Sequence, residues 1–178
     1  MNSHRTFKFS TSIVALLILS LTCCAKNDSE QPIQSQKILI ELQYSGGQIA
    51  PEYIPKLQVI EGSIARLQTG ANTREAEIPI DLNKHLLAKA TNPNFLALDS
   101  ASLKVNTEEL MKKMGSTSPN IMDASVPTIR VWKGQSYHTV SFYAPRAYMR
   151  HTGDNPGLAR FVELLNDLEQ LYSFFPDN

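Results

Sequence analysis

The chain has 178 residues, in which 17 lysine and arginine side chains balance 17 acidic ones, and it has only two cysteines. The length suits one domain with a core of its own. No basic surplus is present to neutralise phosphates, so nucleic acid is not an expected partner. Both cysteines lie at positions 23 and 24, and none follows them. We therefore expect no disulfide and no cysteine-based site further along the chain.

The first 24 residues have the features of a bacterial secretory signal. Arg5 and Lys8 precede an apolar run at residues 13–19, which leads into Leu21-Thr22-Cys23-Cys24. A basic segment, an apolar core and small residues before a cleavage point are typical of signal peptides. The apolar run is too short for a spanning helix, which needs about 20 residues.

The sequence Leu21-Thr22-Cys23-Cys24 resembles the lipobox of bacterial lipoproteins. The resemblance implies diacylglycerol on the sulfur of Cys24, cleavage just before it and acylation of the new amino group. Several acyl chains anchor a protein stably. Ala25 follows in place of an aspartate and resembles the sorting pattern for the outer membrane, facing the periplasm. Cys23 is a second candidate at a poorer spacing, and an uncleaved anchor or an ordinary signal peptide is the alternative.

Three parts are therefore expected: a signal peptide at 1–23, the lipidated Cys24 with a flexible polar tether to residue 36, and one domain at 37–176. Removal of the signal peptide takes two basic residues and no acids, so the net charge falls to about −2.

The first half of the domain predicts strands followed by helices. Apolar side chains alternate along residues 37–44, which indicates a strand. Residues 57–60 and 64–68 flank a glycine turn and predict a hairpin. A helix is expected from Asp81, as its cap, to about residue 90, and a second from Thr107, as its cap, to about residue 114.

The second half predicts a hairpin and a long helix. Residues 128–132 and 137–143 surround a short turn, with Ile129 and Val140 on one face and Trp132 on the other. The last helix is expected to run from Pro156 to about residue 172, capped by Asp154 or Asn155, with an apolar stripe that packs on the sheet. The fold class is therefore α+β: a small, mostly antiparallel sheet with two hairpins, one or two short middle helices and a C-terminal amphipathic helix.

No motif for catalysis or metal binding is present. The four histidines lack the spacing of zinc ligands, and neither a nucleophile elbow nor a phosphate-binding loop occurs. We therefore expect a protein that is not an enzyme and has no cofactor or metal. A sugar-binding face built from the tyrosines and Trp132 is a minor alternative.

Two segments are candidate partner-binding surfaces. In the first, Ser45, Gly46 and Gly47 precede a proline-rich stretch with Tyr53; glycines permit close backbone approach, although an irregular strand crossover explains them too. The second is the connection at residues 143–151, whose candidate residues are Arg146, Tyr148 and Arg150. Arginine and tyrosine are enriched at interfaces, although a solvated loop is the alternative.

The domain as a whole resembles the emfourin-type small proteins, which include inhibitors of thermolysin-like metalloproteases. The resemblance rests on the first strand ending in Tyr44-Ser-Gly-Gly47, Leu57-x-Val59 with the Gly62 turn, Asp123-Ala-Ser before Thr128-Ile-Arg-Val, His138-Thr-Val and the closing Leu/Phe-rich helix. It covers most of residues 37–173 and assigns no inhibitory residue. This chain departs from the family pattern in its lipid anchor, its proline-rich loop and the greater length of the middle of the domain.

The functional expectation is a membrane-anchored lipoprotein of the cell envelope, with a non-catalytic domain that binds an envelope or secreted protein. The alternative implied by the resemblance is a protein inhibitor of a metalloprotease. An enzyme with dispersed catalytic residues is the third hypothesis.

Overall fold

A computed structural model describes residues 37–46, 50, 53–116, 125–152 and 155–176. All of them belong to one compact unit at residues 36–178. Cys24 and the rest of the predicted signal and tether lie outside the described residues, as do Gly47 and Asp154.

The centre of the fold is a six-stranded antiparallel sheet with the strand order β4-β3-β2-β1-β5-β6. The strands are β1 (Ile38–Ser45), β2 (Lys56–Ile60), β3 (Ile64–Thr69), β4 (Asn72–Glu77), β5 (Val126–Lys133) and β6 (Ser136–Ser141). The first strand is therefore central, between a three-stranded meander and a hairpin. The α+β fold predicted from the sequence is confirmed.

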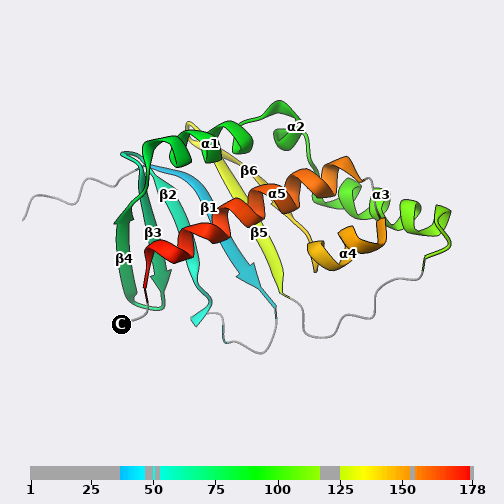
Figure 1. Cartoon of the computed structure of the whole chain (residues 1–178), viewed down its shortest axis with the longest axis horizontal. Coiled ribbons are helices and arrows are strands. Elements are labelled where there is room, and N and C mark those ends of the chain that lie inside the picture. Colours follow the sequence, from blue (N-terminus) through cyan, green and yellow to red (C-terminus); the bar gives the residue numbers. More distant parts are fainter. Residues whose placement is uncertain (1–36, 47–49, 51–52, 117–124, 153–154, 177–178) are drawn as a thin grey trace, which may run out of the picture. The chain divides into compact units, whose positions relative to one another are not determined.

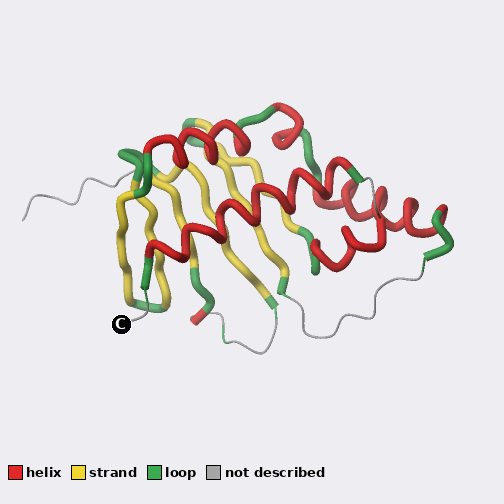
Figure 2. Tube along the Cα trace, viewed as in Figure 1, coloured by secondary structure: helices red, strands yellow, loops and turns green. Residues whose placement is uncertain are grey.

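The helices are α1 (Ile80–Ala90), α2 (Pro93–Leu96), α3 (Ser100–Lys113), α4 (Pro145–Thr152) and α5 (Pro156–Gln170), followed by a 3-10 turn, η2 (Leu171–Phe174). Helix α5 runs across the sheet, as Figures 1 and 2 show. Its buried stripe, Leu158, Phe161, Val162, Leu164, Leu165 and Leu168, joins one apolar core with the inward side chains of β1, β2, β3, β5 and β6. Burial of such side chains is the main stabilising contribution to the fold.

Both predicted hairpins and the cap of the last helix are confirmed. Strand β2 pairs with β3, and β5 pairs with β6 with Ile129 opposite Val140. The side chain of Asn155 accepts a hydrogen bond from the backbone N–H of Leu158, and Pro156 is in the first turn. A proline fits there because the first N–H groups of a helix have no partner within it.

The two predicted caps of the middle helices are wrong. Helix α1 begins after Pro79, without a side-chain cap, and Asp81 lies in its first turn. Helix α3 begins seven residues earlier than expected, because Asp99 caps it through the N–H of Ser102. Thr107 is instead fully buried within α3 and donates its hydroxyl hydrogen bond to the carbonyl of Leu103.

Three elements were not expected from the sequence. Strand β4 is polar except for Ala76 and pairs with β3 at the edge of the sheet. Helix α2 is short, begins soon after the end expected for the preceding helix, and is capped by the side chain of Asn92. Helix α4 replaces the loop expected at residues 143–151, because Pro145 occupies its first position and the strand before it ends at Ser141.

The sheet face turned away from the core has a row of polar side chains. Strand pairing places Glu41 directly between Gln58 and Arg130, and Arg66 lies between Gln58 and Glu75. Glu41 is only 4% exposed, and its carboxylate accepts hydrogen bonds from Gln58 Nε2, at 2.8 Å, and from Arg130. A carboxylate so deeply buried needs such partners.

Candidate functional site

The two candidate segments lie at the same end of the sheet. Strands β1 and β5 are antiparallel, so Ser45 at the end of β1 pairs with Val126 at the start of β5, and β6 ends beside them. We define the sheet-end surface by Ser45, Gly46, Val126, Tyr143, Arg146 and Tyr148. Figure 1 shows β1 ending and β5 beginning at the same edge, near α4.

One carboxylate connects the two segments. Glu169 of α5 accepts a hydrogen bond from the hydroxyl of Tyr44, next to Ser45, and another from the guanidinium of Arg146. Arg146 also donates to Asn166 Oδ1 from two nitrogens, at 3.0 and 2.6 Å. The end of β1, the start of α4 and the end of α5 are therefore held together by charge-assisted hydrogen bonds. Arg146, predicted as a contact residue, is largely engaged within the domain.

The tyrosines of this cluster remain protonated over the ordinary pH range. Burial and the hydrogen bond to Glu169 raise the pKa of Tyr44 far above its usual value. Burial, with the negative charge of Glu169, raises the pKa of Tyr172 to about 12. Loss of a proton from either phenol would place a second negative charge beside Glu169. Both phenols are therefore suited to holding the domain together and not to proton transfer.

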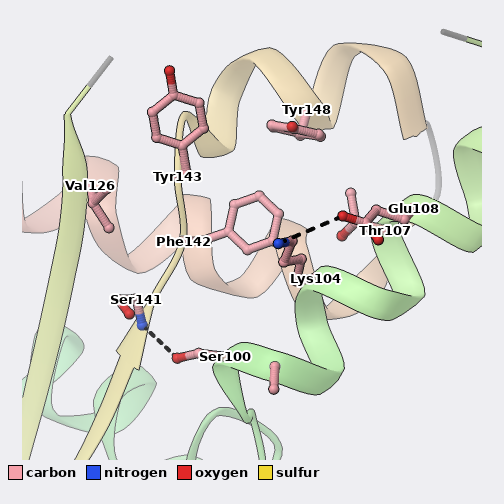
Figure 3. Close-up of a pocket in the computed structure, with 10 residues that line it drawn as sticks. Ser100, Lys104, Thr107, Glu108, Val126, Ser141, Phe142, Tyr143 and Tyr148 are labelled. Carbon is pink, nitrogen blue, oxygen red and sulfur yellow. Dashed lines mark hydrogen bonds and ion pairs between the residues drawn. The ribbon is translucent and has the colours of Figure 1, made fainter. Parts of the chain in front are cut away.

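A pocket of about 490 Å³ opens beside the sheet-end surface, between α3 and α4. Val126, Phe142, Tyr143 and Tyr148 form most of its apolar wall, and Lys104 and Glu108 of α3 line another side (Figure 3). The ammonium group of Lys104 lies 3.9 Å from the Glu108 carboxylate. The pocket thus combines an aromatic wall with an exposed ion pair, the composition expected of a site that binds an apolar group in a polar surround.

The corner between β6 and α4 shapes this pocket. Ala144 has a positive φ of 46°, which turns the chain sharply before Pro145. The ring of Tyr148 then packs edge-on against Phe142, with 5.5 Å between the ring centroids. The adjacent Tyr143 is 38% exposed and Met149 is 37% exposed. The turn thus places Tyr148 in the wall of the pocket, beside the partly exposed Tyr143.

The remaining sequence candidates are less closely tied to the pocket. Gly46 has the positive φ, 81°, that its glycine was expected to allow. Tyr53 is 64% exposed, and Arg150 is exposed on α4. Sequence reasoning missed Val126, Phe142 and the α3 residues of the pocket, because only the fold brings the start of β5 and the middle of α3 together.

A second charged cluster joins α1 to α5. Lys89 lies 2.6 Å from both Glu163 and Asp167, and His85 Nε2 lies 3.2 Å from Asp167. Although burial alone would lower the pKa of Lys89, hydrogen bonds to Asp167 and Glu163 raise it above its ordinary value. These contacts hold α1 against the last helix.

Within the described ranges, no three histidine, cysteine, aspartate or glutamate side chains are grouped so as to hold a metal ion. None of the helices described there is long and apolar enough to cross a membrane.

No protein-family model matches this chain, and no curated protein matches its sequence. The resemblance to emfourin-type proteins and the lipobox assignment both remain predictions.

Proposed function

We propose that this protein is a bacterial lipoprotein, anchored through Cys24 in the outer membrane and facing the periplasm, whose domain binds another protein without catalysis. The aromatic pocket beside the sheet-end surface is the observation that carries the binding proposal. The partner is a protein of the envelope, or a secreted one, that inserts a large apolar side chain between α3 and α4.

The composition of the pocket supports a polypeptide partner. Tyrosine is enriched at protein interfaces, and binding energy concentrates where an aromatic or aliphatic anchor fills a pocket. Tyr143 lines the pocket, and Lys104 and Glu108 supply a polar rim. A buried anchor with a polar rim is the common arrangement of such an interface.

Filling the pocket tests the binding proposal. Ala101 is exposed on α3 and lines the pocket, so Ala101→Phe should occlude it. Val105→Phe is the matched control, because Val105 is 51% exposed on the same helix and does not line the pocket. Cross-linking in intact cells, followed by purification of the chain, should recover an envelope protein with the wild type and Val105→Phe. Recovery should fall at least about tenfold with Ala101→Phe, in keeping with a hot-spot loss of more than 1.4 kcal/mol. Equal recovery from both variants would rule out the pocket.

The anchor proposal rests on the sequence of residues 13–24 and has its own test. Mass spectrometry of protein extracted from membranes should give the mass of the chain without residues 1–23, plus acyl chains. Cys24→Ala should lack the acyl mass. An unacylated wild type recovered as soluble protein would contradict the anchor but leave the pocket test unaffected.

Inhibition of a metalloprotease is the second candidate function. Besides the family resemblance, it is favoured by the 64% exposure of Tyr53, which follows the glycine turn. The purified chain should then slow a thermolysin-like protease, and Tyr53→Ala should weaken that effect while Ala101→Phe should not. No inhibition at micromolar concentrations would exclude this candidate.

A further inference from the structure

The outer edge of β6 has backbone groups available for pairing. The N–H of Phe142 donates to the carbonyl of Pro127 in β5. In an antiparallel pair, the N–H and C=O groups of successive residues point alternately toward the partner strand and away from it. Val140 and His138 therefore also bond to β5. The N–H and C=O groups of Tyr137, Thr139 and Ser141 point away from the sheet. The N–H of Ser141 donates to Ser100 Oγ at 2.9 Å, as Figure 3 shows, so α3 ends the available stretch. The outward backbone groups of Tyr137 and Thr139 are therefore not paired by any strand of the described residues.

The two edges of the sheet differ in charge. Edge strand β4 includes Arg74, Glu75 and Glu77, and Arg74 also donates to the carbonyl of Pro176 and lies over the ring of Phe175. Charged side chains and a covering segment are the usual protection of an edge against pairing. Edge strand β6 has the sequence Ser-Tyr-His-Thr-Val-Ser, without lysine, arginine or acid. Between Tyr137 and Thr139 it therefore lacks the charged side chains that protect β4.

We propose that β6 pairs with β6 of a second copy of this chain, antiparallel, about a two-fold axis at His138. Tyr137 then lies opposite Thr139 of the second copy, and Thr139 opposite its Tyr137. Each of these pairs exchanges two backbone hydrogen bonds, so the four outward donors and four outward acceptors of the two strands match one another. The result is a continuous twelve-stranded sheet.

The unpaired part of the β6 edge is self-complementary, which favours a second copy of this chain as its binding partner. Its two outward residues stand symmetrically on either side of His138, and an uncharged strand does not repel its own copy. In the pairing, the two His138 residues face each other at the centre as a non-hydrogen-bonded pair, where side chains approach most closely. Tyr137, which is 59% exposed, gains Thr139 of the second copy as its cross-strand neighbour.

The closeness of the two central residues permits a direct test by cross-linking. The Cα atoms of such a pair are about 4.5 Å apart, within the range of a disulfide. Purified full-length chain with His138→Cys, in which Cys23 and Cys24 are also replaced by alanine so that position 138 has the only thiol, should form a covalent dimer on mild oxidation. Thr73→Cys is the matched control, since Thr73 is exposed on the opposite edge strand and is not expected to cross-link. Cross-linking of His138→Cys no greater than that of Thr73→Cys or of the unsubstituted chain would overturn the proposal.

Proline at position 139 gives a second, independent test. Thr139→Pro removes an N–H that points away from β5, so the monomer fold is retained while pairing is blocked. Thr139→Val keeps the N–H and is the control. Because few residues pair, the dimer is expected to be weak, and sedimentation velocity should show concentration-dependent self-association for wild type and Thr139→Val only.

The double variant His138→Cys/Thr139→Pro should lose the cross-link, and near-ultraviolet circular dichroism of the Thr139→Pro chain should match the wild type. A wild type that stays monomeric at millimolar concentration would overturn the proposal. Equal association of wild type and Thr139→Pro would do so as well.

Discussion

At the scale of single residues, Glu41 is the clearest case of a side chain whose role depends on its strand neighbours. It lies on the face of β1 away from the core and would be expected in solvent. Instead it is buried by Gln58 and Arg130, which pair with it from the strands on either side. The sequence predicts the strand, but the burial depends on partners 17 and 89 residues away.

Replacing Glu41 tests this account. Glu41→Ala should destabilise the domain by about 2 kcal/mol, because Arg130 and Gln58 lose their acceptor. The value lies below that of a fully buried pair because the Arg130 side chain is 33% exposed. Glu75→Ala, in the same polar row but 42% exposed, should cost less than about 1 kcal/mol. Urea denaturation measures both, and equal losses would contradict the burial argument.

Tyr172 should make the domain less stable at alkaline pH. Its pKa is raised from 10.0 to about 12 by burial and by the charge of Glu169. The unfolded chain therefore loses this proton first, so the stabilising contribution is complete below pH 10 and is lost as the pH rises from 10 to 12. The pKa of Tyr44 is also raised, so its ionisation likewise makes the domain less stable at alkaline pH.

Tyr172→Phe should therefore reduce the fall in unfolding free energy between pH 9 and pH 11, measured by denaturant titration at each pH. Tyr53→Phe, at a side chain that is 64% exposed, is the control. An alkaline loss in Tyr172→Phe as steep as that of the wild type would refute the assignment.

At the scale of elements, the successes and failures of sequence reasoning have distinct physical causes. Helix α5 has a proline, a capping asparagine and an apolar stripe, and the sequence predicts it correctly because all three are local signals. Strand β4 has no apolar alternation because it is an exposed edge strand, so only its pairing with β3 defines it. The approach of Tyr44, Arg146 and Glu169 spans up to 125 residues and has no local signal.

The sequence places the start of α3 too late, because Thr107, followed by two acids, imitates a helix cap. In the structure it joins α3 to α5: Asn155 Nδ2 donates to Thr107 Oγ1 at 3.0 Å, and both residues are buried. The same Asn155 caps α5. One asparagine therefore fixes the start of the last helix and its position against α3.

Asn155→Ala should cost about 2–3 kcal/mol, because it removes a helix cap and a buried hydrogen bond together. Thr107→Val removes only the hydroxyl and should cost about 1 kcal/mol. The double variant should cost less than the sum of the two single variants, because the residues share a bond. Thermal or urea unfolding of the four proteins measures the coupling, and strict additivity would argue against it.

At the scale of the whole molecule, the order β4-β3-β2-β1-β5-β6 makes the first strand the centre of the sheet. The pairing of β1 with β5 joins residues separated by the meander and three helices. This pairing places the ends of β1, β5 and β6 together, so the sheet-end surface and the pocket depend on a long-range contact. The sequence identified Ser45 and Tyr148 separately, but only this topology places them near one another.

The buried core is drawn from residues 40–175, so we expect the domain to be stable without its anchor. Cys24→Ala should leave the unfolding midpoint within about 1 °C of the wild type in the same detergent, since a change below about 0.2 kcal/mol gives such a shift. Leu42→Ala, at a fully buried position in the central strand, should lower the free energy of unfolding by about 2–5 kcal/mol. Unfolding of both variants can be followed by the near-ultraviolet circular dichroism of Trp132. A large loss in Cys24→Ala would mean that the anchor contributes to the fold, and the expected division between tether and domain would have to be withdrawn.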